Sequence, residues 1–238
     1  MRISSIFSFY GGKSKIVNCY HPPKYGKIIE PFAGAAAYAW RWHDREVWIN
    51  DQDPRIYALW RFLLSPDALA MVREYVPLVV KAGQKIAELL PEDAPEGLRE
   101  LMRAEANQGT QGATGVHDQI TSMGARCWNI LPKMEVVIPA IAHWVVTNLP
   151  HEKVEFTDPA TWFIDPPYNN AAGRRYRVQV GDYDQLAQYC QSRPGQVIVC
   201  ENMGATWLPF APLEHRRVSI RSRYQKADAK EVVFTCQN

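Results

Sequence analysis

The chain contains no long apolar run and no marked excess of charge of either sign. Its 238 residues are 47% hydrophobic and 22% charged, with a formal net charge of +2. No apolar stretch approaches the roughly 20 residues of a membrane-spanning helix. The N-terminal stretch MRISSIFSFYGGKSK also lacks the apolar segment and the cleavage site of a signal peptide. We therefore expect a cytoplasmic globular protein of one domain, or of one domain that carries an insertion.

Paired cysteine motifs are absent as well. The five cysteines are odd in number, and no two of them form a Cys-x-x-Cys pair. Free thiols in a reducing compartment are therefore expected, and neither a zinc site nor another metal is predicted. The cysteines are Cys19, Cys127, Cys190, Cys200 and Cys236.

The glycine-rich loops of common nucleotide-binding proteins are missing too, but two small-residue turns are present. The stretch EPFAGA has one glycine where a dinucleotide-binding loop has three, and YGGK lacks the leading GxxxxG of a Walker loop. EPFAGA separates a predicted strand, Lys27–Glu30, from a helix expected from about Gly34 to His43. Open α/β sheets bind ligands at the carboxyl ends of their strands, and small residues let a ligand approach the backbone.

The next segment repeats this strand-to-helix pattern. A strand is predicted over Glu46–Asn50, and a helix is expected to open at Pro54 with Asp53 as its N-cap. Asp51, at the end of the strand, is placed to accept hydrogen bonds from both hydroxyls of a ribose, although Asp-Gln-Asp-Pro is also an ordinary helix cap. Alternating strands and helices indicate a parallel, doubly wound α/β sheet.

From about residue 65 to 150 the pattern becomes helical, which predicts an insertion. Helices are expected within 65–90, 95–108 and 132–149, and the polar, glycine-rich stretch 107–129 precedes the last of them. A stretch of this length without predicted structure is often functional. After the insertion, strands are predicted at 154–156, 161–165, 196–200, 217–220 and 231–236, with a helix near 182–191.

The stretch TWFIDPPYNN ends one of these strands abruptly. Pro166 and Pro167 lack N–H donors and fix φ, so they cannot continue a sheet ladder. Asp165 is therefore expected to sit rigidly at the tip of the strand, where its carboxylate and the neighbouring carbonyls form a fixed set of acceptors. The alternative is that Asp-Pro-Pro is only a turn signal.

Two stretches, GRRYR and HRRVSIRSRYQK, concentrate cations and contain tyrosines but no acid. This pattern is typical of a surface that meets a phosphate backbone, although a solvated basic loop would also account for it. Their arginines are Arg174, Arg175, Arg177, Arg216, Arg217, Arg221 and Arg223.

The order of FYGGK, IIEPFAGAAAY, INDQDP and FIDPPY resembles the Dam-type DNA adenine-N6 methyltransferases. The resemblance covers residues from about 7 to 53 and from 156 to 168 well, and the C-terminal strands more loosely. Ala36 departs from the pattern, since the family usually has glycine there. Residues 65–150 resemble no recognition region that we can identify, so no target sequence is predicted.

The resemblance implies a Rossmann-like S-adenosylmethionine-dependent methyltransferase sheet with a helical insertion. Residues 1–64 and 151–238 would form the catalytic domain, and 65–150 a target-recognition region. The implied reaction transfers a methyl group from S-adenosylmethionine to a flipped-out adenine of double-stranded DNA, with specific or relaxed site choice. A phage or bacterial origin is implied, and a restriction endonuclease partner stays open. The alternatives are a methyltransferase acting on RNA adenine or protein glutamine, and a non-catalytic homologue that binds cofactor or DNA.

The resemblance also assigns roles to residues. The carboxylate of Asp165 and the carbonyl of Pro166 would accept the two N–H bonds of the adenine amine, held in register by both prolines, while Tyr168 stacks on the base. Arginines 174, 175 and 177 would act near the flipped base, and arginines 216, 217, 221 and 223 on the DNA backbone. Phe156 would stack on the cofactor adenine or else pack in the core. The implied cofactor-binding residues are Phe9, Tyr10, Gly11, Gly12, Lys13, Glu30, Pro31, Phe32, Ala33, Gly34, Asp51, Phe156 and Asp165.

Overall fold

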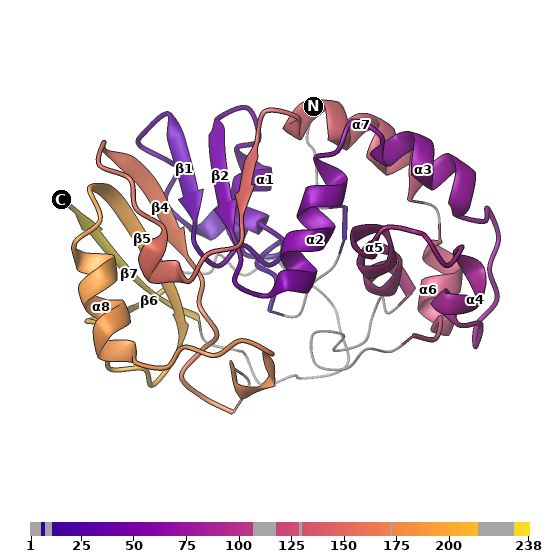
Figure 1. The fold of residues 1–238 in the computed structure, drawn as a ribbon. Helices are drawn as coiled ribbons and strands as arrows, with labels where there is room; N and C mark the ends of the chain where they lie inside the picture. Colours follow the sequence, from indigo (N-terminus) through magenta and orange to yellow (C-terminus); the bar gives the residue numbers. More distant parts are fainter. Residues whose placement is uncertain (1–5, 8–10, 107–117, 129, 172, 214–230) are drawn as a thin grey trace.

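The chain folds around one mixed β-sheet (Figure 1). The computed structural model describes residues 6–7, 11–106, 118–128, 130–171, 173–213 and 231–238. Within them, a seven-stranded sheet has the order β3-β2-β1-β4-β5-β7-β6. The strands are β1 (Lys27–Glu30), β2 (Glu46–Asn50), β3 (Val145–Thr147), β4 (Ala160–Ile164), β5 (Gly195–Asn202), β6 (Ala211–Pro212) and β7 (Glu231–Gln237).

The strands from β3 to β5 run parallel, and β7 is inserted antiparallel to β5 and β6. This arrangement confirms the predicted α/β class. Because β1 lies between β2 and β4, the carboxyl ends of these three strands are neighbours at one edge of the sheet. The residues that follow them therefore come together, although they are far apart in the sequence.

Side chains alternate between two apolar cores, as the period of a strand requires. On β4, Trp162 and Ile164 face a core that includes Leu186 of α8 (Tyr183–Gln191), whereas Phe163 faces the opposite side. There Phe163 stacks on Tyr38 with ring centroids 4.4 Å apart. The second face is covered by α1 (Ala37–Arg41) and α2 (Pro54–Leu63), the latter capped by Asp53 as predicted.

The helical segment extends from α2 and shares its core. Its helices are α3 (Ala68–Tyr75), α4 (Ile86–Leu89), α5 (Glu96–Ala106), α6 (Ser122–Cys127) and α7 (Leu131–Ile141). Helix α5 lies so close to α2 that a Cβ added at Gly97 would be 2.1 Å from the carbonyl oxygen of Ala58. Figure 1 shows these helices beside the sheet, with α8 on the other side.

Three sequence expectations need correction. The helix expected at 65–90 is two shorter helices, since Pro77 disfavours a helical conformation for the residue before it. The stretch Val145–Thr147, predicted as helix, is strand β3 and pairs with β2, so the sheet resumes inside the predicted insertion. The strand predicted at 154–156 is irregular and follows the 3₁₀ helix η2 (His151–Lys153). The strand predicted at 217–220 lies outside the described residues.

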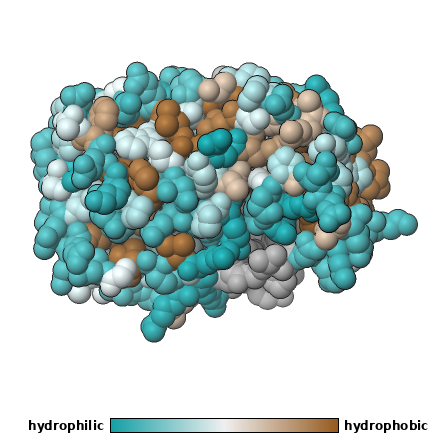
Figure 2. Space-filling model, in the orientation of Figure 1, coloured by the Kyte–Doolittle hydropathy of each residue, from teal (hydrophilic) through white to brown (hydrophobic). Residues whose placement is uncertain are grey.

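Hydrophilic residues dominate the face of the molecule shown in Figure 2, and apolar residues appear there in small groups. Each helix in the described part of the chain is too short or too polar to serve as a membrane span.

Candidate active site

A cavity opens at the carboxyl ends of β1, β2 and β4. Its empty volume is about 810 Å³, including the part that is open to solvent. Ligands of open α/β sheets bind at this edge, and pockets for drug-sized ligands have volumes of about 300–1,000 Å³. The lining residues include Gly11, Gly12, Lys13, Glu30, residues 32–37, residues 51–53, His151, Asp165, Pro167 and residues 176–179.

The turn after β1 brings backbone groups to the cavity wall. Gly34 and Ala36 both adopt left-handed conformations, with φ of 47° and 50°. A glycine is the usual solution for such a backbone, which explains why the resembled family has one where this chain has Ala36. The carbonyl of Gly34 accepts a hydrogen bond from the indole of Trp60 at 2.9 Å, so the turn is fixed from the α2 side.

Two acids lie on this wall, the buried Glu30 and the half-buried Asp51. Asp51 Oδ2 accepts from the Gly34 amide at 2.9 Å, and Oδ1 accepts from the Asp53 amide at 2.9 Å. Burial raises the pKa of Asp51 to about 6, and the two amides limit that rise. Glu30 accepts from the Ala39 amide at 2.6 Å, and burial holds its pKa well above the usual value. The Asp51 carboxylate is therefore ionised at neutral pH and can accept a hydrogen bond from a hydroxyl group of a ligand.

An aromatic pair forms another part of the wall. Phe32 and His151 have ring centroids 5.0 Å apart, and burial lowers the pKa of His151, which favours its neutral form. Sequence reasoning missed His151, which follows β3 at the same edge of the sheet as the other site residues.

Of the two roles left open for Phe156, the structure fits packing in the core. Phe156 is not among the residues that line the cavity, and its side chain packs against the α8 core. Its ring centroid lies 4.7 Å from the ammonium of Lys27 at the start of β1.

A short ion pair at the site joins Lys13 and Asp165. Lys13 Nζ lies 2.7 Å and 2.8 Å from the two carboxylate oxygens of Asp165, and it also donates to the carbonyl of Gly11 at 3.1 Å. Burial opposes a charged Lys13, but Asp165 and Glu231 outweigh it and raise the pKa of the ammonium. Burial raises the pKa of Asp165; Lys13 opposes this rise and Glu231 adds to it. Lys13 was expected to bind the cofactor; its partner in the structure is Asp165.

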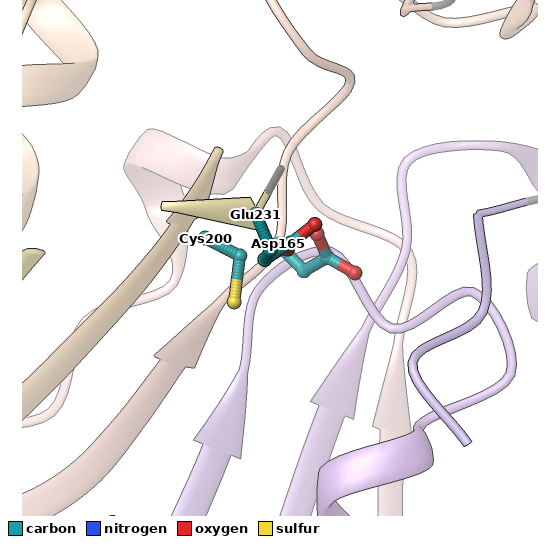
Figure 3. A group of neighbouring side chains, drawn as sticks. All are labelled: Asp165, Cys200 and Glu231. Carbon is teal, nitrogen blue, oxygen red and sulfur yellow. The ribbon is translucent and has the colours of Figure 1, made fainter. Parts of the chain in front are cut away.

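Glu231 and Cys200 complete a cluster that sequence reasoning did not find. One ligand atom each of Asp165, Cys200 and Glu231 lies within 4.8 Å of the others, a grouping of types that can hold a metal (Figure 3). The positive charge beside the two carboxylates is the Lys13 ammonium, and burial raises the pKa of the Cys200 thiol, so the thiol stays protonated. No local spacing could reveal the cluster, because its members come from different strands.

The Asp-Pro-Pro-Tyr segment is held from several sides. Tyr183 of α8 donates a hydrogen bond to the Pro167 carbonyl at 2.6 Å, and the buried Glu201 accepts from the Asn169 amide at 2.7 Å. Within the described part of the chain, nothing donates to the carbonyl of Pro166. That carbonyl therefore keeps its acceptor capacity. Tyr168 is half-buried, and the Lys13 ammonium lies 4.7 Å from its ring centroid.

The segment after this motif folds back over the cavity. A Cβ added at Gly11 would lie 2.2 Å from the hydroxyl of Tyr176, so the two segments touch. Arg177, which was assigned to DNA, is exposed but also lines the cavity, while Arg174 and Arg175 are exposed beside it. The remaining assigned residues lie outside the described residues: Phe9, Tyr10, Arg216, Arg217, Arg221 and Arg223.

Comparison with known families agrees with this geometry. Residues 9–87 match the family model of D12 class N6 adenine-specific DNA methyltransferases, which confirms the resemblance predicted from the motifs and supports methyltransferase activity. The matched stretch contains Lys13, the turn after β1 and Asp51, and it ends before the Asp165 motif. The seven-stranded sheet is consistent with a Rossmann-like methyltransferase fold. None of the curated proteins compared with the chain matches it.

Proposed function

We propose that the protein transfers a methyl group from S-adenosylmethionine to the exocyclic amine of an adenine that is flipped out of double-stranded DNA. The observation that carries this proposal is the position of Asp165 at the end of β4, directly before Pro166 and on the same cavity as Gly34 and Asp51. An acceptor pair for an amine thus adjoins a site suited to a nucleoside.

The cavity residues fit S-adenosylmethionine. Asp51 supplies an acceptor for ribose hydroxyls, and the Phe32–His151 pair offers ring surface to a purine. Gly34 leaves room for close approach to the backbone, since it carries no Cβ. When bound, S-adenosylmethionine supplies an electrophilic methyl group.

The exocyclic nitrogen of adenine is a weak nucleophile because its lone pair is delocalised into the ring. Two acceptors placed on its N–H bonds favour localisation of that pair on nitrogen. Asp165 supplies one acceptor through its carboxylate, and Pro166 supplies the other through its carbonyl. Since β4 and the prolines hold both, they contribute through pre-organisation. Asp165 is also available to take up the proton that the amine loses after transfer.

Lys13 leaves capacity on Asp165 for this role. An ionised carboxylate has about four lone-pair sites, and Lys13 uses one on each oxygen. The ammonium favours the ionised form of Asp165 against the effect of burial. We therefore assign Lys13 to Asp165, which revises the expectation that it binds the cofactor.

The DNA-facing part of the proposal rests on Tyr168 and the arginines that follow it. Flipping a base costs a few kcal/mol, and stacking on an aromatic ring returns about 1–3 kcal/mol. Arg174 and Arg175 are exposed directly after the motif, where a phosphate backbone would have to pass to deliver a base to Asp165.

The test is to incubate the purified protein with S-adenosylmethionine carrying a labelled methyl group and with double-stranded DNA, RNA or a glutamine-rich protein in parallel. We expect label only in DNA, recovered as N6-methyladenine after nucleoside digestion. Label in RNA or protein would favour the corresponding alternative, and no label with measurable cofactor binding would indicate a non-catalytic homologue. Sequencing that maps N6-methyladenine on a plasmid would then give the target site.

A further inference from the structure

We propose that Glu231 is a positioning residue for methyl transfer, which holds the Tyr168 hydroxyl and the Lys13 ammonium so that the base-stacking ring and the Asp165 carboxylate keep a fixed relation. This inference rests on the proposed function and deepens it, because it concerns the same site. Glu231 lies 66 residues after Asp165 and outside every motif that carries the resemblance.

The contacts of Glu231 converge on one atom. Its Oε1 accepts hydrogen bonds from the hydroxyls of Tyr168 and Tyr20, the latter at 2.9 Å, and lies 3.6 Å from Lys13 Nζ. The Glu231 side chain is 9% exposed, and that of Lys13 is 6% exposed. Burying a charged carboxylate costs free energy unless it is paired and hydrogen-bonded, and these partners meet that requirement.

The backbone of Glu231 is fixed as firmly as its side chain. Glu231 begins β7 and is paired with Asn202 of β5, while its carbonyl accepts from the Leu213 amide at 3.0 Å. A side chain that starts from a strand paired on both sides has little freedom to follow a moving partner. The Tyr168 hydroxyl is therefore anchored to the sheet through Glu231.

Glu231 acts on the two halves of the proposed chemistry in different ways. Through the Tyr168 hydroxyl it sets the plane of the ring on which the base is stacked. Through its charge it draws the Lys13 ammonium toward itself, which restrains the position of that ammonium against Asp165. Loss of Glu231 would disturb the geometry of transfer, while Asp51 and the turn after β1 would keep their contacts with a cofactor.

The charge of Glu231 gives a readout that a packing role would not. The ionisable groups that the structure places around it are Lys13, Asp165, Tyr20, Tyr168 and Cys200. Glu231 raises the pKa of Asp165 by like-charge repulsion and raises that of Lys13 by attraction. Removing the charge should therefore let Asp165 ionise at lower pH. The acid limb of a plot of kcat against pH should then move in the acid direction.

The experiment compares Glu231→Gln, Glu231→Asp and Tyr168→Phe with the wild type for kcat on DNA, for cofactor Kd and for the pH profile. We expect Glu231→Gln to lower kcat about tenfold or more, with cofactor Kd within about threefold and with the acid limb shifted. Glu231→Asp keeps the charge, so it should keep the wild-type acid limb and lose kcat alone. Tyr168→Phe keeps the ring and loses the hydroxyl that binds Glu231, so it should lower kcat without moving cofactor Kd.

Glu105→Gln provides the matched control, since Glu105 is a buried glutamate of α5 that does not line the cavity. Its pH profile should not move. Wild-type kcat and an unshifted acid limb in Glu231→Gln would overturn the inference while leaving the proposed function intact. If Glu231→Gln fails to fold, wild-type kcat in Tyr168→Phe would overturn it equally. A wild-type protein that methylates no DNA adenine would overturn both proposals.

Discussion

Asp165 and Asp51 follow neighbouring parts of the same sheet, but their carboxylates contact different groups. Asp165 pairs with an ammonium, and Asp51 accepts from two backbone amides. The Asp165 carboxylate, whose charge is balanced by a side chain, can also accept a hydrogen bond from a substrate amine. The Asp51 carboxylate is held by backbone amides and is therefore a rigid part of the cavity wall. The two residues should therefore act on separate steps.

Replacing Asp165 should abolish methyl transfer and leave cofactor affinity within a few-fold. The reason is that its proposed contact is with the target amine. Single-turnover rates and calorimetric titration with S-adenosylmethionine would check both parts for Asp165→Ala and Asp165→Asn. Asp165→Ala should also lower thermal stability, because removing one partner of a buried ion pair costs about 3–5 kcal/mol. A variant that kept a tenth of the wild-type kcat would refute the acceptor role.

Asp51→Ala should weaken cofactor binding at least tenfold, since hydrogen bonds to a charged group contribute about 1.5–3 kcal/mol. The wild-type affinity should also depend on pH. Burial raises the pKa of Asp51 to about 6, so the carboxylate is charged at neutral pH, and affinity should fall as the pH drops through 6. Calorimetry across this range would show the fall in the wild type.

His151 lines the same cavity and gains its proton as the pH falls, so Asp51→Ala is needed to separate the two groups. Only the part of the pH dependence that disappears in this variant belongs to Asp51. Unchanged affinity in Asp51→Ala would return Asp51 to a helix-capping role.

At the level of elements, the sequence predicted those whose signal is local. The strand bounds of β1 and β2 and the start of α2 were correct, because a short apolar run, an N-cap and a proline define them within a few residues. β3 was missed because Val145–Thr147 directly continues the apolar pattern of α7. The motif residues Asp165 and Asp51 were found, whereas Glu231 was not, since its partners are 63 to 218 residues away in the chain.

The loop after the Asp-Pro-Pro-Tyr motif depends on Gly173. A Cβ there would lie 1.8 Å from the carbonyl oxygen of Tyr168, and backbone cannot give way as a side chain can. Gly173→Ala should therefore displace Tyr168 and lower kcat about tenfold or more. Gly181→Ala is the matched control, because an added Cβ meets nothing within 4 Å. Equal kcat in the two variants would show that the loop tolerates movement.

The same loop should separate cofactor contacts from DNA contacts. Arg177 lines the cavity, whereas Arg174 does not. Arg177→Ala is expected to lower cofactor affinity several-fold, and Arg174→Ala to leave it unchanged while altering which adenines are methylated or weakening DNA binding. A phosphate contact would lower the salt slope of DNA binding by about 1. Cofactor titrations and DNA titrations at two salt concentrations would measure this, and identical effects of both changes would contradict the separation.

Over the whole molecule, the helical segment and the sheet share one core, so they should unfold together. Gly97→Ala tests this at the closest approach of α5 to α2. Helix propensity alone would stabilise this variant by about 1 kcal/mol, but the clash with Ala58 should destabilise it by about 1–3 kcal/mol. Gly26→Ala, with open space around an added Cβ, is the control. Thermal unfolding should show a single lowered transition for Gly97→Ala; two separated transitions would mean that the helices form an independent unit.

Strand β7 has a consequence for the order in which the protein is made. It pairs with β5 along seven residues and carries Glu231. During translation β5 leaves the ribosome first, and until β7 follows, an apolar strand presents unpaired backbone groups of the kind that recruit other chains. The strand that closes this edge also carries Glu231, the last member of the cluster of Asp165, Cys200 and Glu231 to be synthesised. A nascent chain is therefore prone to aggregation for as long as its active site is incomplete. The pairing of β7 with β5, late in synthesis, both covers the exposed strand and completes the site.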